Sequence, residues 1–472
     1  MKIGSPKAGT LAAFAGALFV FLGTTGTSHG APNPHPPAEK DERATAEVPR
    51  LHALVHVVGS GHETWKSIAE AYLDRTDVYD VDDLARAIAR ENPHAARVGL
   101  KQGLEIKIPH VLPSPPTNKR LGLPADKEIR GIYVRGDTAG RRTYPALLDR
   151  MVAHGMNAIV LDVKDYDGWL TYESKVPHAI ESGANKHASI RSYARAVQFA
   201  HRRGIRVIAR VSCFEDELQS RLHPRSMGIR GKLGGLFRNG WLDPKSPEAQ
   251  AYTLALVREV LDFGVDEVQL DYVRYPVTKI KNADFGLDKH NPRAKVEVIT
   301  RFVERAHALT KAHSVPLSLD VFGVIALGRR VDIENLGQDP PELAKHAEFL
   351  SPMVYPSHYD PGFFGYDAPG DHPELVGIGV KQIKETIAQA GVTNGATIRP
   401  WLQAMRHKSS TYGTDYIQRE IKTGNDAGGH GWLLWNPGQN YEVSWRAVPR
   451  KTNGAPRSGV IERASFRKRT RK

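Results

Sequence analysis

Two aspartates that interrupt apolar runs are the side chains of this sequence best placed to do chemistry. Asp271 lies in a run that begins at about Asp266, and Asp320 lies in a run that begins at Pro316. Because strand side chains alternate between two faces, apolar neighbours facing one way turn these carboxylates the other way, into the space that the strands enclose. Paired carboxylates in such a space supply the acid, base or nucleophile for glycosidic bond cleavage. An ion pair with an arginine such as Arg210 is the structural alternative.

Side chains on neighbouring runs could complete such a site. A proton donor must keep its proton near neutral pH, and a second carboxylate nearby raises the pKa of a carboxylic acid. The alternative proton donors are Asp162, Glu215 and Asp165. The candidate substrate-binding residues are cationic, aromatic or polar side chains near strand ends: Lys164, Arg210, Arg274, Tyr355, His358, Trp401, Gln403 and Trp435. Aromatic faces stack on the C–H faces of sugar rings, so this set favours a carbohydrate ligand, although for each cation an ion pair is the alternative role.

Eight apolar runs must position these residues. They begin at about Ile129, Met156, Arg206, Asp266, Pro316, Phe349, Thr397 and Gly429, with amphipathic segments near 143–154, 190–203, 247–263, 295–313, 332–347, 375–390 and 412–426. Strands that alternate with helices predict right-handed crossovers and a parallel sheet, and eight such units close an α/β barrel of the (β/α)8 type. A doubly wound open sheet is disfavoured because no glycine-rich phosphate fingerprint follows the first strand.

One register turns polar side chains inward on at least five of these strands. The expected inward set is Tyr133, Arg135, Asp162, Lys164, Arg210, Ser212, Gln269, Asp271, Ser318, Asp320, Tyr355, Trp401, Gln403 and Trp435. A barrel interior used only for packing would be filled by branched aliphatic residues. A layer of acids, bases and aromatics near the C-terminal ends of the strands therefore predicts a site.

Four motifs in this region match a known family. They are GIYV at 131–134, VLDVKD at 160–165, DEVQLDYVRYP at 266–276 and SPMVYPSHY at 351–359. Through them, residues 129–445 resemble the bacterial "putative glycosyl hydrolase" TIM-barrel domain family. The resemblance implies a barrel of glycosidase ancestry, with no substrate assigned.

The same region is distantly similar to alpha-amylase-like barrels, in which an Asp that ends the fourth strand is the nucleophile and the acid ends the fifth strand. Asp271 and Asp320 occupy those places, but Asp320 stands where a Glu is expected and Gln403 where a seventh-strand Asp is expected. The resulting hypothesis makes Asp271 the nucleophile or transition-state stabiliser and Asp320 the general acid/base, with Arg210, Lys164 and Tyr355 orienting carboxylates or hydroxyls.

The N-terminal part carries a second set of motifs. His56-Val57-Val58, GHETW at 61–65, Asn92-Pro93 and GLEIKIP at 103–109 make residues 52–110 similar to a LysM module, a small βααβ unit. The resemblance implies binding to polymers that contain N-acetylglucosamine, such as peptidoglycan or chitin. A long connection near 74–80 departs from the usual module, and a structural docking role is the alternative.

The ends of the sequence predict export. Lys2 and Lys7 precede an apolar run at 11–22, and small residues stand at 28 and 30, so residues 1–30 are expected to be a signal peptide. Cys213 is the one cysteine, which allows no intramolecular disulfide and no lipid anchor after the apolar run. We expect a secreted, periplasmic or cell-envelope location.

Composition divides the rest of the chain. Residues 31–51 and 111–126 read as Pro-rich linkers that flank the LysM-like part, residues 127–449 as the barrel and residues 450–472 as a disordered tail. The tail has nine Lys or Arg and one acid, so it carries +8 of the net charge of +13. The tail is expected to contact anionic envelope surfaces, with no nucleic acid partner.

The combined prediction is an exported glycoside hydrolase that acts on a cell-wall or extracellular polysaccharide. The alternative is a catalytically inactive, wall-anchored carbohydrate-binding protein. No metal-ligand spacing, P-loop or catalytic Ser/His motif is present in the sequence, so no metal and no cofactor are expected.

Overall fold

The computed structural model describes residues 54–122, 128–235, 237, 240–277, 280–393 and 395–450. The predicted signal peptide, the first predicted linker and all but the first residue of the predicted basic tail lie outside these residues. Among the described helices, none combines the length and the apolar character that a membrane span requires.

Residues 54–108 form a small domain with its own core. Its strands β1 (Leu54–Val57) and β2 (Glu105–Ile108) pair antiparallel, and between them lie α1 (Trp65–Tyr72), η1 (Leu73–Arg75), α2 (Val81–Glu91) and α3 (Pro93–Val98). Thr64 caps α1 through a reciprocal capping box with Ser67. The buried residues Ile68, Leu84 and Ile106 belong to one apolar cluster of this domain. The order βααβ is present, with a third short helix before the last strand; its LysM identity stays a prediction.

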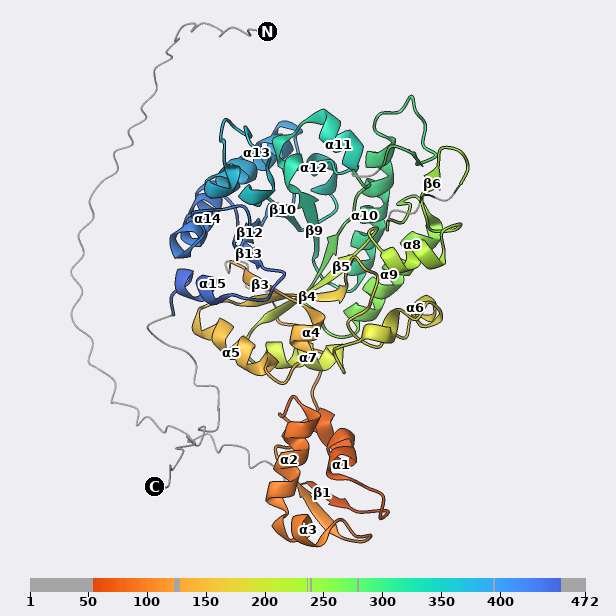
Figure 1. Ribbon diagram of the computed structural model, residues 1–472, viewed down its shortest axis with the longest axis vertical. Coiled ribbons are helices and arrows are strands. Elements are labelled where there is room, and N and C mark those ends of the chain that lie inside the picture. The colour runs from red at the N-terminus through yellow and green to blue at the C-terminus, as the bar shows by residue number, and fades with distance from the viewer. Residues whose placement is uncertain are drawn as a thin grey trace, which may run out of the picture. The chain divides into compact units, whose positions relative to one another are not determined.

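A parallel sheet forms the second part of the molecule (Figure 1). Its strands are β3 (Arg130–Val134), β4 (Ala158–Lys164), β5 (Arg206–Ser212), β7 (Glu267–Asp271), β9 (Leu317–Phe322), β10 (Phe349–Met353), β11 (Thr397–Ile398), β12 (Trp401–Gln403) and β13 (Trp432–Trp435). Their spatial order is β11-β10-β9-β7-β5-β4-β3-β13-β12.

The two edges of this sheet are halves of the seventh predicted run, so the sheet closes on itself. Strand β11 pairs with β10, while β12 pairs with β13. The run is interrupted at Pro400, which has no N–H to donate to a ladder. Backbone bonds from Arg399 N to Leu350 O (2.9 Å) and from Leu433 N to Pro400 O (3.0 Å) continue the connection across the break. The predicted (β/α)8 barrel is confirmed.

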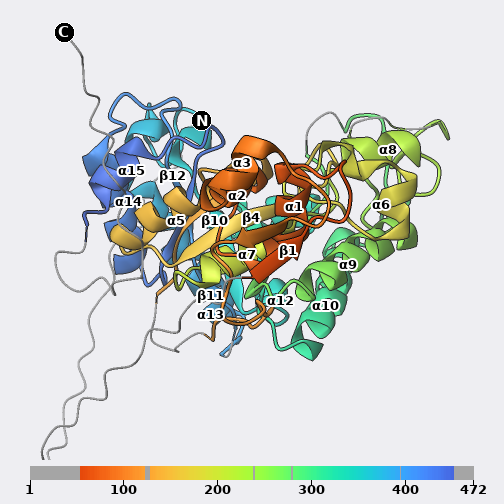
Figure 2. The same ribbon diagram turned by 90° about the horizontal axis from the view of Figure 1, so that it is seen from below.

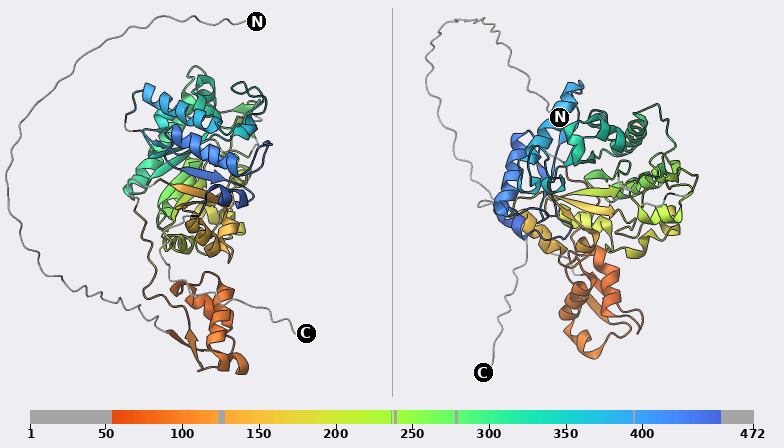
Figure 3. Two further views of the ribbon diagram at one scale, coloured as in Figure 1. Left: turned by 90° about the vertical axis from the view of Figure 1, so that its left-hand side faces the viewer. Right: turned by 45° about the horizontal axis from the view of Figure 1, so that its top comes forward.

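Helices surround the strands, as Figures 2 and 3 show from further directions. The main ones are α5 (Tyr144–Ala153), α7 (Tyr193–His201), α9 (Pro247–Leu261), α10 (Ala294–Ala312), α13 (Leu375–Gln389), α14 (Thr414–Asp426) and α15 (Glu442–Ala447). The segment expected to form one helix at 332–347 forms two, α11 (Arg330–Leu336) and α12 (Pro340–Leu343). Gly337, at φ 76°, ends α11 in a left-handed conformation that favours glycine.

The strand register separates two layers of side chains. Residues such as Leu161, Val207 and Leu319 face outward and pack with the helices in the main core. On the inner side, Tyr133, Ile208 and other buried residues form a second cluster inside the barrel. The alternation of apolar-out and mixed-in positions therefore brings the polar residues near the strand ends to one interior.

Part of the second predicted linker is held against the barrel. The Asn118 side chain donates to Asp262 O (2.8 Å), and the Arg120 guanidinium donates to Leu261 O (2.7 Å). The Leu121 N–H donates to the Asp266 carboxylate at 2.6 Å. These bonds make residues 118–121 a strap across the ends of α9 and β7.

Candidate active site

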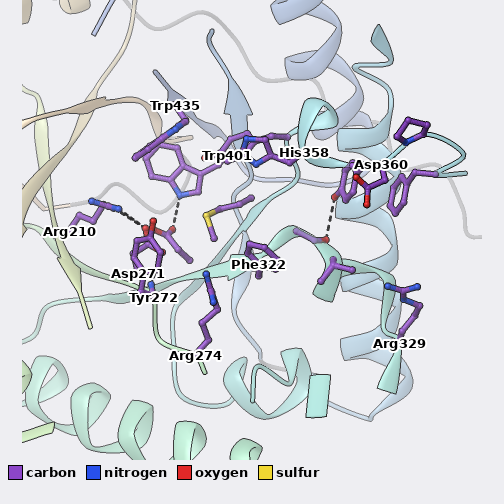
Figure 4. A pocket seen from close by; sticks show the side chains of 18 residues that line it. Arg210, Asp271, Tyr272, Arg274, Phe322, Arg329, His358, Asp360, Trp401 and Trp435 are labelled. Atoms are coloured by element: carbon purple, nitrogen blue, oxygen red, sulfur yellow. Dashed lines mark hydrogen bonds and ion pairs between the residues drawn. The ribbon is translucent and has the colours of Figure 1, made fainter. Parts of the chain in front are cut away.

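A cavity of about 490 Å³ lies at the C-terminal ends of the barrel strands (Figure 4). The side chains that line it come from the ends of β5, β7, β9, β12 and β13 and from the loops that follow β7, β9 and β10. Of the predicted site residues, Arg210, Asp271, Arg274, Asp320, Tyr355, His358, Trp401 and Trp435 line this cavity. In a closed parallel barrel, this end is where active sites are found.

Asp271, the last residue of β7, is surrounded by donors. The Arg210 guanidinium donates to its Oδ2 from Nε at 3.1 Å and from Nη2 at 2.7 Å. The Tyr272 N–H donates to Oδ1 at 2.6 Å. Both oxygens thus accept hydrogen bonds that stabilise a negative charge, and the paired Arg210 is itself only 1% exposed.

Tyr272 adopts an unusual backbone conformation next to this carboxylate. Its φ is +50°, a left-handed value that costs a non-glycine residue about 1–3 kcal/mol. The turn points the Tyr272 N–H at the side chain of the preceding residue. The strain therefore accompanies the hydrogen bond that fixes Asp271 at the end of its strand.

Asp320 lies beside Asp271 on the neighbouring strand. The ladder between β7 and β9 pairs Gln269 with Ser318 and Leu270 with Leu319, so the two aspartates stand next in register. Burial, and then the charge of Asp271, raise the pKa of Asp320 well above its ordinary value. The Trp401 indole N–H donates to Asp320 Oδ1 at 2.6 Å. This geometry favours a protonated Asp320 beside an ionised Asp271.

Arg210 also binds a second carboxylate, that of Asp162. Arg210 Nη1 donates to Asp162 Oδ1 at 2.6 Å, and the Tyr133 hydroxyl donates to Asp162 Oδ2 at 2.5 Å. Burial raises the pKa of Asp162 to about 7, against the lowering effect of Arg210. Asp165 lies 3.6 Å from the same guanidinium. Neither acid lines the cavity, so both are placed to hold Arg210 rather than to meet a substrate.

Arg274 lines the cavity inside a ring of aromatic side chains. Its guanidinium carbon lies 4.6 Å from the Trp241 ring centroid, 4.8 Å from that of Phe322 and 5.5 Å from that of Tyr272. Its Nη1 donates to Tyr275 O at 3.2 Å. Burial lowers the pKa of Arg274, while the nearby Asp271 opposes that shift. Stacking of this kind fixes the plane of the guanidinium.

Glu215, the remaining alternative acid, is half-buried after β5. Burial raises the pKa of Glu215 to about 7, and the charge of Arg274 opposes the rise. The residue is not among those that line the cavity. Glu215 therefore has a pKa that suits a proton donor, but its side chain lies outside the cavity where a substrate would bind.

Two residues predicted to bind substrate do not reach the cavity. The ladder between β4 and β5 is irregular between Asp162 and Lys164, so the alternation that predicted an inward Lys164 fails there. The Lys164 ammonium instead pairs with Asp216 at 2.5 Å, fully buried. Gln403 is also buried, and its amide donates to Met405 O (3.1 Å) and His407 O (3.2 Å). Both predictions are corrected: these side chains hold loops.

The far wall of the cavity comes from the loops after β9 and β10. The Tyr359 and Phe363 rings stack there at 3.9 Å, and both line the cavity. Arg329 and Asp360, at the same end in Figure 4, were not among the predicted site residues. Both follow barrel strands, so the rule that sites draw on these loops is the signal that could have found them.

Comparison with known proteins gives one family. The family model described as "Putative glycosyl hydrolase domain" matches residues 131–441, a span that includes all of the cavity-lining residues. A search of the curated proteins finds no significant match.

Several solved structures are similar to parts of the chain. A hypothetical protein from Ruminiclostridium thermocellum is 30% identical over 40% of this chain and 97% of its own, with a TM-score of 0.35. The catalytic domain of beta-amylase from Paenibacillus polymyxa is 12% identical over 70% and 96% of the two chains, with a TM-score of 0.44. Alpha-L-fucosidase isoenzyme 2 from Paenibacillus thiaminolyticus is 15% identical over 68% and 49%, with a TM-score of 0.46.

Proposed function

We propose a mechanism and a substrate class for this chain on the premise that it belongs to the "Putative glycosyl hydrolase domain" family. The chain is a glycoside hydrolase. We propose further that Asp271 is its nucleophile, that Asp320 is its general acid/base and that it cleaves a polysaccharide with retention of configuration at the anomeric carbon.

The observation that carries this proposal is the contrast between two neighbouring carboxyl groups. Asp271 accepts two hydrogen bonds from Arg210, while Asp320 has a raised pKa because it is buried beside that charge. Neighbouring strands lie about 4.8 Å apart, which suits the roughly 5–5.5 Å between the carboxyls of a retaining pair. A stable anion and a stable acid are what the first step of that mechanism requires.

The first step depends on where Asp320 carries its proton. Asp320 Oδ1 is engaged by the Trp401 indole, so the acidic proton belongs on Oδ2, from which it passes to the glycosidic oxygen. As the bond to the leaving group breaks, an oxygen of Asp271 attacks the anomeric carbon and forms a glycosyl ester. Asp320, now ionised, takes a proton from water while the water oxygen attacks the anomeric carbon. The bond between that carbon and Asp271 breaks, which releases the sugar and restores both carboxyls.

Aromatic side chains of the cavity support a carbohydrate substrate. Trp401, Trp435 and Tyr355 lie beside the carboxyls, and Trp435 itself stacks on Tyr133 with ring centroids 4.2 Å apart. Flat apolar faces beside a few polar groups are the usual lining of a sugar-binding site. We propose that the substrate is a cell-wall or extracellular polysaccharide.

Three further proposals concern the rest of the chain. The small domain at 54–108 would bind a polymer that contains N-acetylglucosamine, such as peptidoglycan. The protein would be exported, and its basic tail would contact an anionic envelope surface. Binding by one domain would raise the local substrate concentration for the other.

The test is release of reducing ends by the purified mature chain from a panel that includes peptidoglycan and chitin. Wild type should release sugars from one substrate class, and Asp271→Asn and Asp320→Asn should each release at least about 100-fold less, in line with the loss of a catalytic group. Asp426→Asn, an exposed aspartate on α14 paired with Lys422, is the matched control. Pull-down of the same polymers without release by wild type would favour the inactive, carbohydrate-binding alternative.

A further inference from the structure

A group of metal-binding side chains lies away from the cavity. Among the described residues, His178, His223 and Glu248 each offer one ligand atom, and these atoms lie within 4.8 Å of one another. None of the three lines the cavity. The sequence led us to expect no metal, because the three residues are far apart along the chain.

Three separate elements supply the group. His178 lies in α6 (Pro177–Glu181), His223 directly follows α8 (Glu217–Leu222), and Glu248 is in the first turn of α9. The His178 and His223 rings lie 4.6 Å apart, centroid to centroid. The fold thus brings the loop after β4, the loop after β5 and the start of α9 to one point.

A buried amide fixes the tautomer of His178. Its Nε2 is 3.0 Å from Gln219 Oε1, which can only accept, so Nε2 must carry the hydrogen. Gln219 has no exposed surface, and its amide donates to Ser182 Oγ at 2.8 Å. Because the Ser182 hydroxyl gives its own hydrogen to Ala179 O at 3.3 Å, it accepts from Gln219, and the other end of the amide is the oxygen. Nδ1 of His178 then keeps the lone pair. A ligating histidine is usually oriented by such a bond from its other ring nitrogen.

The other two groups are available for a ligand. In the part of the chain that the structure describes, no hydrogen bond or ion pair engages the His223 ring or the Glu248 carboxylate. His223 is at the C-terminal end of α8, where the helix dipole favours a positive charge. The exposed side chain of Glu248 is free to rotate toward the rings.

We propose that His178, His223 and Glu248 form a binding site for a divalent transition metal, best suited to Zn²⁺. Two imidazoles and one carboxylate, with water in the fourth position, are a known tetrahedral zinc ligand set. Bonds of about 2.0–2.2 Å place tetrahedral ligands roughly 3.3–3.6 Å from one another. The three ligand atoms, which lie within 4.8 Å of one another, would therefore have to move closer by rotation of their side chains when the metal binds.

The metal would link the loops after β4 and β5 to the start of α9. Asp216 precedes α8 and caps it by accepting the Gln219 N–H at 2.8 Å, and it also pairs with the buried Lys164. Glu215 directly precedes that cap. A metal on His223 at the other end of α8 would therefore hold the short helix at both ends and stabilise the folded state.

The experiment uses untagged full-length protein, stripped of metal with a chelator and then titrated with Co²⁺ as a spectroscopic probe and with Zn²⁺. The expected result is one equivalent of Co²⁺ with the visible absorption of a tetrahedral site, its displacement by Zn²⁺ and a rise in Tm with Zn²⁺. His178→Ala, His223→Ala and Glu248→Gln should each weaken binding more than about tenfold. His290→Ala, which removes an exposed histidine elsewhere, should leave binding unchanged.

Two outcomes would overturn the proposal. One is the absence of stoichiometric binding by wild type at micromolar metal. The other is wild-type affinity in His223→Ala and Glu248→Gln, whose side chains make no other bond among the described residues. If His178→Ala fails to fold because its ring packs 4.9 Å from Tyr252, these two variants decide the question.

Discussion

The Trp401 indole nitrogen donates a 2.6 Å hydrogen bond to Asp320 across the barrel, from the seventh strand run to the fifth. The bond occupies one oxygen of a carboxyl group that is only 1% exposed, and among the described residues it is the one side-chain hydrogen bond to that group. It therefore orients the proposed proton donor. It also stabilises the ionised form, so it limits how far burial raises the pKa of Asp320.

Replacing Trp401 by Phe keeps an aromatic ring and removes the donor. Without the bond, the pKa of Asp320 should rise further, so the alkaline limb of the pH–kcat profile should move to higher pH. The value of kcat should fall about 10-fold or more because the acid is less well oriented. Full pH–rate profiles check both effects. Trp445→Phe, on α15, is the control, and an unshifted limb in Trp401→Phe would show that the indole does not tune this acid.

The leaving group separates the two proposed catalytic roles. Dinitrophenol departs without needing a proton from the enzyme. Relative to wild type, Asp320→Asn should therefore lose far less activity on a dinitrophenyl glycoside than on the natural polymer. Asp271→Asn should lose activity on both, because its nucleophile is missing. Initial rates on a panel of aryl glycosides measure this. Equal losses on both substrates in the two variants would contradict the division of roles.

The barrel could be predicted from sequence because its signals are local. Strand alternation and helical periodicity need only a few residues, and they turned Asp271 and Asp320 to the same interior. The prediction for Lys164 was wrong because a single irregularity in β4 reverses the alternation, and apolar patterning does not reveal it. The ligand group of His178, His223 and Glu248 was missed because it forms only when two loops and the start of α9 meet in the folded chain.

Stability should fall as pH rises from about 4 to about 7. The pKa of Asp162 is raised to about 7 by burial, so the folded state holds a proton that the unfolded state has already released. Its contribution is fully present below the unfolded value of 3.8 and is lost as pH rises through about 7. Glu215, Asp320 and Glu420 have raised pKa values too and act in the same direction.

Asp162→Asn tests this linkage. The variant cannot titrate at this position, so its Tm should change less than that of wild type between about pH 5 and pH 8. Its Tm at pH 5 should also be lower, because the bonds to Arg210 and Tyr133 are weakened. Thermal unfolding over that range measures both, beside Asp426→Asn as an exposed control. A slope equal to that of wild type would contradict the burial argument.

The buried pair of Lys164 and Asp216 should be structural. Both side chains are fully buried, so Lys164→Met leaves an uncompensated carboxylate and should cost about 3–5 kcal/mol in the free energy of unfolding. The double variant Lys164→Met/Asp216→Asn should recover part of that loss, limited by the weaker cap of α8. Since Lys164 does not line the cavity, KM measured on the folded fraction should stay within about twofold of wild type. Urea unfolding and steady-state kinetics on wild type and the two variants supply the data, and a large rise in KM with little loss of stability would restore the role in substrate binding.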